Sequence, residues 1–172
     1  MKQFCVVLRG APASGKTTIA KRLRNYEDKV AWLKVDAFKD FFADDATPAL
    51  EYVHGVALAT LEYLLNQGFS VVLDGVFQDT TAIDRIIEVA KLNGVSSSVF
   101  QLHCPLDVLL ERDKNRLGVK EGCRKSLGID VMTKIWQKLE ATPYLTTINL
   151  DTQMVSPDEC VAKIQQKVIS TI

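Results

Sequence analysis

Residues Gly10–Thr17 carry the clearest chemical signal in the sequence. They read GAPASGKT and match the pattern G-x-x-x-x-G-K-[ST] in full. The two glycines let the backbone curl so that successive amides point at phosphate oxygens, and a helix beginning near Lys16 adds the positive end of its dipole. Lys16 would reach the β and γ phosphates of a nucleotide, and the Thr17 hydroxyl would bind Mg²⁺. The residues expected to contact the nucleotide are Gly10, Ala13, Ser14, Gly15, Lys16, Thr17 and Thr18.

Two aspartates directly follow apolar runs, Asp36 after residues 30–35 and Asp74 after residues 69–73. Asp36 would face the γ-phosphate, where it could act as a general base and accept the proton of an acceptor hydroxyl. The alternative is that it caps the short segment that follows. Asp74 fits the pattern of an aspartate that orders Mg²⁺ or its water shell, although Asp74-Gly75 is also a turn dipeptide.

Positive side chains are concentrated between Arg112 and Lys125, where six stand against two acidic residues. Arg112 and Arg116 are four residues apart, so they project from one helical face and could stack on the base and clamp the transferred phosphate. We expect Arg112 to bind the nucleotide, Arg116 to act in catalysis and Arg124 to bind the acceptor. A mobile lid at about 112–128 would exclude water from the phosphates. The alternative is a solvated charged loop.

The segments that must position these residues alternate between apolar runs and amphipathic stretches. Strands are expected at 4–8, 30–35, 69–73, 99–102 and 146–150. Helices are expected at 16–25, 50–68, 83–93, from 105, at 130–140 and after Ser156, which has capping-box spacing to Glu159. This alternation predicts an α/β fold with a parallel sheet between two layers of helices. Ligands bind such sheets outside the carboxyl ends of the strands, where the glycine-rich pattern, Asp36 and Asp74 fall.

The composition is that of a globular chain, and residues 1–172 are expected to form a single domain. Twenty-one basic side chains balance 21 acidic ones, so net charge attracts the molecule neither to nucleic acid nor to an anionic membrane. The four cysteines lack C-x-x-C spacing, which indicates neither a zinc cluster nor a disulfide framework. The sequence shows no leader and no long apolar segment, so we expect a cytoplasmic protein without a membrane partner.

Four segments resemble the P-loop kinases related to chloramphenicol phosphotransferases, zeta toxins and the kinase domains of polynucleotide 5'-hydroxyl kinases. They are Gly10–Thr17, Asp36 with Lys39, VVLDGVF at 71–77 and CPLDVLLERDKNR at 104–116. The resemblance implies a P-loop NTPase fold, a three-layer α/β/α sandwich with a five-stranded parallel sheet of order 2-3-1-4-5. It also implies that Asp36 is the base. Family members often carry D-x-x-R after the second strand, whereas here Lys39 takes the arginine's place and lacks its bidentate fork.

Together these residues favour an ATP- and Mg²⁺-dependent phosphotransferase that acts on a hydroxyl of a small molecule, such as a metabolite or an antibiotic. Its acceptor is expected to contact Asp36, Lys39, Asp74 and Arg124. One alternative is a polynucleotide 5'-hydroxyl kinase. Such an enzyme would need a basic groove, which the neutral composition does not indicate. A second alternative is a non-kinase ATP-binding switch, which would need no base aimed at an alcohol. The sequence is compatible with a monomer or a homodimer.

Overall fold

The computed structural model describes residues 2–42, 49–116 and 125–170. Five parallel strands form its centre, in the order β2-β3-β1-β4-β5. The strands are β1 (Phe4–Gly10), β2 (Val30–Lys34), β3 (Ser70–Gly75), β4 (Ser96–His103) and β5 (Thr147–Asp151). Both the parallel sheet and the strand order that the resemblance implies are therefore confirmed.

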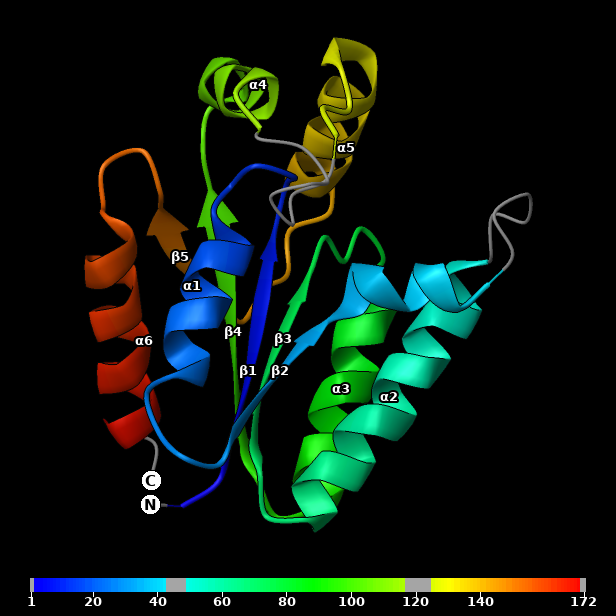
Figure 1. The fold of residues 1–172 in the computed structure, drawn as a ribbon, viewed down its shortest axis with the longest axis vertical. Coiled ribbons are helices and arrows are strands. Elements are labelled where there is room, and N and C mark those ends of the chain that lie inside the picture. The colour runs from blue at the N-terminus through cyan, green and yellow to red at the C-terminus, as the bar shows by residue number, and fades with distance from the viewer. Residues whose placement is uncertain (1, 43–48, 117–124, 171–172) are drawn as a thin grey trace.

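Helices cover both faces of the sheet (Figure 1). On one face lie α1 (Lys16–Arg24) and α6 (Pro157–Ser170), and on the other lie α2 (Leu50–Asn66) and α3 (Thr81–Leu92). Beyond the carboxyl ends of the strands lie α4 (Leu106–Lys114) and α5 (Ile129–Ala141), and the 3-10 helix η1 (Val35–Phe41) follows β2 directly. Within the described ranges, no helix is long and apolar enough to span a lipid bilayer.

The central strands are apolar because both of their faces are covered. Every residue of β1 and of β3 is buried. Val7 and Leu73 pack into the hydrophobic cluster beneath α2 and α3, whereas Val6 and Val72 pack into the cluster beneath α1 and α6. Side chains alternate between the two faces of a strand, so a run without polar interruption is what two covered faces require.

Strand register brings the chemically active segments to one edge of the sheet. Asp74 of β3 pairs with Leu8 of β1 on one side and with Lys34 of β2 on the other. The sequence-based end of β3 at residue 73 was too early, because the backbone stays paired through Gly75. Asp74 therefore lies inside the sheet between the strand that leads into the glycine-rich loop and the strand that leads to Asp36.

The expected start of β4 was also wrong, by three residues. Ser96, Ser97 and Ser98 already pair with the first residues of β1. These serines have no apolar side chains, so they give no hydrophobic pattern that would predict a strand. Their pairing is made by the backbone. A pattern of hydrophobic residues could not have detected them.

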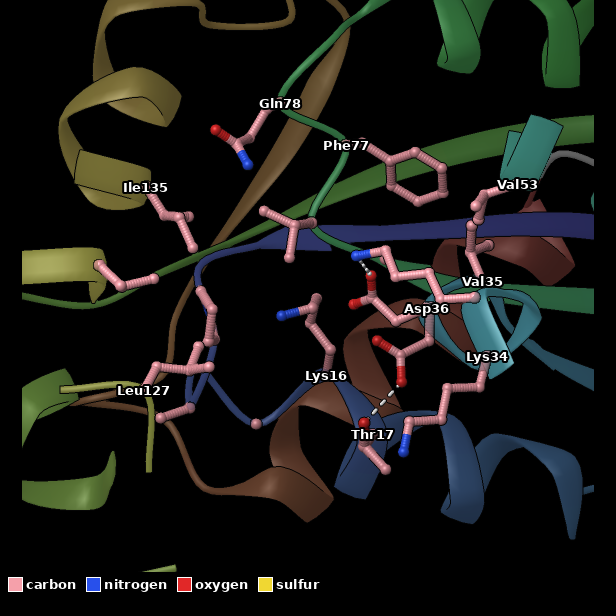
Figure 2. A pocket seen from close by; sticks show the side chains of 18 of the residues that line it. Lys16, Thr17, Lys34, Val35, Asp36, Val53, Phe77, Gln78, Leu127 and Ile135 are labelled. Carbon is pink, nitrogen blue, oxygen red and sulfur yellow. Dashed lines mark hydrogen bonds and ion pairs between the residues drawn. The ribbon is translucent and has the colours of Figure 1, made fainter. Parts of the chain in front are cut away.

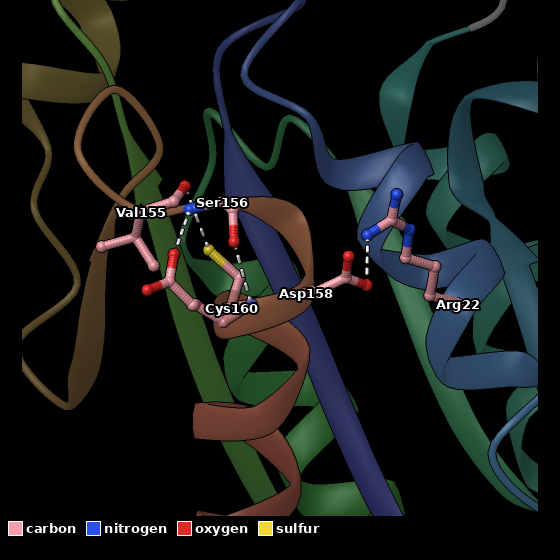
Figure 3. A network of polar contacts seen from close by, with 6 residues as sticks. Arg22, Val155, Ser156, Asp158 and Cys160 are labelled. Atoms are coloured by element: carbon pink, nitrogen blue, oxygen red, sulfur yellow. Dashed lines mark hydrogen bonds and ion pairs between the residues drawn. The ribbon is translucent and has the colours of Figure 1, made fainter.

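The capping box at the start of α6 is confirmed (Figure 3). The Ser156 amide donates to Glu159 Oε2 at 2.8 Å, and the Glu159 amide donates to Ser156 Oγ at 3.3 Å. These hydrogen bonds lower the pKa of the Glu159 carboxyl group. One residue of the same turn, Asp158, forms an exposed ion pair with Arg22 of α1, which connects the two helices of this layer.

A fully buried arginine connects the sheet to the elements at its carboxyl end. Arg9 of β1 donates from Nε to Phe77 O at 3.0 Å, from Nη1 to Gln101 Oε1 at 2.6 Å and from Nη2 to Thr142 O at 2.7 Å. Its partners belong to the segment after β3, to β4 and to the residue that ends α5. Because buried polar groups must be satisfied, removing this guanidinium leaves three acceptors without a donor.

We expect Arg9→Met to lower the free energy of unfolding by at least about 2 kcal/mol, because the orphaned acceptors keep their desolvation cost. Urea unfolding followed by circular dichroism measures the change. Arg22→Met is the matched control: its ion pair with Asp158 is exposed, so a loss below about 1 kcal/mol is expected. Equal losses in the two variants would contradict the role given to Arg9.

Candidate active site

The turn between β1 and α1 has the backbone of an anion-binding nest. Ala13 and Gly15 have positive φ angles of 65° and 91°, and the Ser14 amide donates to Ala11 O at 3.2 Å. Left-handed residues in a tight turn allow neighbouring amides to point into one concavity. Gly10 is required for packing, since a Cβ there would lie 2.7 Å from Leu102 O. The helix α1 begins directly after Gly15, so its positive end faces the same concavity.

A cleft of about 440 Å³ opens over this turn (Figure 2). It is lined by the turn, the end of β2 with η1, the start of α2, the segment after β3, and parts of α4 and α5. The predicted residues that line it are Ala13, Gly15, Lys16, Thr17, Thr18, Asp36, Lys39, Asp74, Arg112 and Arg116. The other two predicted residues of the turn do not line the cleft: Ser14 is buried, and Gly10 is the last residue of β1. The prediction for Arg124 falls outside the described residues.

Lys16 is held at the centre of the cleft (Figure 2). Its side chain is buried, and Nζ donates to Ala11 O at 2.8 Å. Burial lowers the pKa of Lys16, while the carboxylates of Asp74 and Asp36 oppose that shift and Arg116 adds to it. Two carboxylates and one guanidinium from three other segments therefore act on a single ammonium group.

Thr17 and Asp74 meet at the floor of the cleft. Thr17 Oγ1 donates to Asp74 Oδ2 at 2.6 Å, and Asp74 is only 3% exposed. Hydroxyl and carboxylate oxygens are the ligands that Mg²⁺ takes from proteins when phosphates supply the rest of its coordination. Among the described residues no group of three or more His, Cys, Asp or Glu side chains could hold a metal alone. The pair therefore fits a magnesium ion that arrives with a nucleotide.

Asp36 lies in the first turn of η1, at the carboxyl end of β2. The residue in the capping position of η1 is Lys34, so the capping alternative for Asp36 is wrong. Lys39 Nζ donates to Asp36 Oδ1 at 2.8 Å, one turn further along η1. Both side chains are about one third exposed, at 32% for Asp36 and 36% for Lys39. The carboxylate is thus oriented by a neighbour while it still faces the cleft.

Arg116 is positioned by the buried carboxylate of Asp113. No functional role was predicted for Asp113 from the sequence, where it counted only as one of the two acidic residues in the basic segment. Arg116 Nε lies 3.0 Å from Asp113 Oδ1, and Asp113 is 1% exposed. Asp113 Oδ2 accepts from Ser126 Oγ at 2.7 Å, from Leu127 N at 2.8 Å and from Gly128 N at 3.3 Å. One carboxylate thus joins the end of α4 to the residues that lead into α5.

Arg112 has a partner of its own outside the cleft floor. Its Nη2 donates to Thr152 O at 2.7 Å, and Nη1 lies 3.3 Å from Thr152 Oγ1. These contacts hold the guanidinium of Arg112 beside the residue that follows β5, at the border of the cleft. Its predicted contact with the nucleotide would have to use the exposed face of the guanidinium.

Several residues that line the cleft were not predicted from the sequence as site residues. His54 of α2 and Phe77 after β3 form part of one wall, with ring centroids 6.1 Å apart. Phe77 has a positive φ of 48°, which nothing in a single sequence reveals for a phenylalanine. On the opposite side, Leu127, Val131 and Ile135 present apolar side chains from the start of α5 and the residues before it. Helical spacing could have suggested these, since Val131 and Ile135 are four residues apart.

The fold and this cleft define a nucleotide-binding P-loop domain, and the chain belongs to the AAA domain family, whose model matches residues 5–140. No curated protein matches the sequence. Among solved structures the chain is similar to the Deinococcus radiodurans tunicamycin resistance protein, with 16% identity over 97% of this chain and 96% of that chain and a TM-score of 0.69. It is also similar to a gluconokinase from Sinorhizobium meliloti 1021, with 17% identity, coverages of 98% and 97% and a TM-score of 0.66.

A further similarity is to a chain of the Pnkp1/Rnl/Hen1 RNA repair complex. The identity is 21%, over 82% of this chain and 45% of that chain, with a TM-score of 0.66. At such identities the likeness establishes a kinase-like P-loop fold, and the resemblance to small P-loop kinases is confirmed. The acceptor molecule has to be argued from the cleft itself.

We expect Lys16→Ala to lower the rate of ATP turnover by at least about 10²-fold, because the cleft loses the cation that would face the transferred phosphate. ADP release with Mg²⁺ and ATP measures the rate, and calorimetry measures nucleotide binding. Lys21→Ala, on the exposed side of α1, is the matched control and should retain both. Unchanged turnover in the Lys16→Ala protein would show that the loop does not act on ATP.

We expect Asp113→Asn to lower the free energy of unfolding by about 1–3 kcal/mol, because an amide cannot replace all the acceptor contacts of the buried carboxylate. Thermal unfolding of the two proteins gives the difference. Asp107→Asn, an exposed position on the same helix, should change stability by less than about 0.5 kcal/mol. If Asp113→Asn is as stable as the wild type, the connection between the end of α4 and the residues that lead into α5 does not depend on this side chain.

Proposed function

We propose that the chain is an ATP-dependent kinase that transfers the γ-phosphoryl group to a hydroxyl of a small molecule. The proposal is supported by one observation above all: Asp36 lines the same cleft as Lys16 and is close enough to act on it electrostatically. A carboxylate beside the phosphate-binding lysine is what proton removal from an alcohol requires. The family match and the kinase-like fold support the proposal at a coarser level.

In the proposed reaction, the acceptor hydroxyl gives its proton to an Asp36 carboxylate oxygen as its oxygen bonds to the γ-phosphorus. The bond between that phosphorus and the β–γ bridging oxygen breaks, and ADP leaves with the electron pair. Lys16 and the amides of the turn stabilise the charge on the phosphate oxygens, and Arg116 adds a guanidinium held by Asp113. Thr17 and Asp74 would hold Mg²⁺, which would neutralise part of the phosphate charge when the nucleotide binds.

The charges of the cleft favour a small acceptor over a nucleic acid. Of the cations that line the cleft, Lys16, Arg112 and Arg116 would be used by the nucleotide and Lys39 donates to Asp36, so Lys34 alone of the described lining residues is left for further phosphates. A polyanionic strand would need cations that are available to its phosphates. An ATP-binding switch is also less favoured, because it would have no use for a carboxylate oriented beside the transferred phosphate.

We expect Asp36→Asn to retain ATP binding and to slow phosphoryl transfer by at least about 10²-fold, since an amide cannot accept the hydroxyl proton. The assay counts ADP released above the acceptor-free background in a panel of hydroxylated metabolites, antibiotics and short 5'-hydroxyl oligonucleotides. Asp40→Asn, exposed on the same 3-10 helix, serves as the control. Transfer at the wild-type rate by Asp36→Asn would remove this residue from the mechanism.

A further inference from the structure

We infer that the acceptor subsite takes an uncharged alcohol whose hydroxyl is carried by an apolar ring or chain, and that His54 and Phe77 select it. This inference rests on the proposed function, since it names the class of molecule that would receive the phosphoryl group. It concerns the part of the cleft next to Asp36, which we call the acceptor wall. The acceptor wall consists of Val35, Leu50, Val53, His54 and Phe77.

The acceptor wall is an edge of the hydrophobic core. Val35, Val53 and Phe77 belong to the buried cluster between the sheet and the helices α2 and α3, and each is at most 4% exposed. Leu50, at the first turn of α2, extends the same surface toward solvent. Most of the exposed area of the acceptor wall therefore belongs to Leu50 and His54, and contact with this part of the wall favours the hydrocarbon part of a ligand.

The charges beside the acceptor wall act against an anionic acceptor. The Asp36 carboxylate faces the position where the hydroxyl must react, and the ammonium of Lys39 lies 2.8 Å from it. This cation is therefore already compensated. A carboxylate or phosphate on the acceptor would approach a like charge without gaining a free partner from Lys39, which discriminates against anionic sugars and nucleic acids.

His54 supplies a neutral polar contact within the acceptor wall. Its ring is half-buried, and no described residue forms a hydrogen bond with its ring nitrogens. Burial lowers the pKa of His54, against the opposing effects of Asp79 and Asp36, and Lys39 and Arg85 lower it further. A neutral imidazole offers one donor and one acceptor, which suits a second hydroxyl or an amide on an uncharged molecule.

Phe77 is held in place against its backbone preference. Its φ of 48° lies in the left-handed region, which large side chains rarely adopt. Arg9 Nε donates to Phe77 O at 3.0 Å, and a Cβ on Gly75 would lie 2.8 Å from the ring. The buried arginine and the glycine together fix the ring beside His54. Because strained residues concentrate at ligand sites, we assign to the edge of this ring that lines the cleft a contact with the acceptor.

The test uses the two histidines of the chain, His54 and His103, whose imidazole resonances are followed by NMR. His54→Gln assigns the signal. With Mg²⁺ and a non-hydrolysable ATP analogue present, the probes are benzyl alcohol, cyclohexylmethanol, gluconate and a 5'-hydroxyl thymidine trinucleotide. We expect the two neutral alcohols to shift the His54 signal, and the two anionic probes to need at least about tenfold higher concentrations for the same shift. His103, which pairs with Glu140 outside the cleft, should not respond.

A second pair of variants tests the selection directly. His54→Lys places a cation on the acceptor wall, so the dissociation constant for benzyl alcohol should rise about tenfold and that for gluconate should fall. These constants are followed by competition or by the methyl resonances of Val53 and Leu50. His103→Lys is the matched control, since it adds the same charge elsewhere and should change neither constant. Because His54 is a half-buried position on a helix, both proteins are expected to fold.

Either of two results would overturn the inference: no shift of His54 with any neutral alcohol, or equally strong binding of an anionic probe. The proposed kinase activity is judged separately, by ADP release with each probe and ATP. Transfer to anionic acceptors alone would keep the kinase and remove the acceptor-wall assignment. Binding of neutral alcohols at His54 without any ADP release would keep the subsite and remove the kinase.

Discussion

The hydrogen bond from Thr17 to Asp74 joins the two segments on which the rest of the site depends. Thr17 stands at the start of α1, directly after the anion-binding turn, and Asp74 stands in β3 between β1 and β2. Because Asp74 is buried and its strand is paired on both sides, the bond anchors the turn to the centre of the sheet. The distance from the phosphate-binding amides to the end of β2, and hence to Asp36, follows from the spacing of neighbouring strands.

The cleft has two chemically different sides, and the buried Arg9 connects them. One side consists of backbone amides, Lys16 and the Thr17–Asp74 pair, which suit phosphates and a metal. The other side is an edge of the core. Arg9 precedes the anion-binding turn by one residue and donates to Phe77 O on the apolar side and to Thr142 O at the end of α5. A displacement at any of these elements would therefore be resisted by the same guanidinium, whose hydrogen bonds are sheltered from water.

The sequence predicts those parts of the site that depend on local backbone chemistry. Gly10–Thr17 is recognisable because a phosphate nest needs glycines, a lysine and a hydroxyl at fixed positions, and Asp36 and Asp74 are recognisable because they end apolar runs. Asp113 could not be identified in this way, since its partners Arg116, Ser126, Leu127 and Gly128 are distributed over two elements. The left-handed conformation of Phe77 likewise arises from tertiary contacts with Arg9 and Gly75. Strand order was available only through the resemblance to a family, because periodicity fixes the faces of strands and not their neighbours.

The position of Lys39 beside Asp36 determines what its charge can do in the cleft. An arginine there could hold Asp36 with one nitrogen and offer others of its rigid fork to an anionic acceptor, whereas an ammonium is a point charge. Here that charge is directed at Asp36, 2.8 Å away and one turn earlier in η1. Lys39 therefore orients the carboxylate without providing a planar clamp for carboxylate or phosphate groups. The ammonium directed at Asp36 and the apolar character of the neighbouring wall are the two features on which the inference of an uncharged acceptor rests.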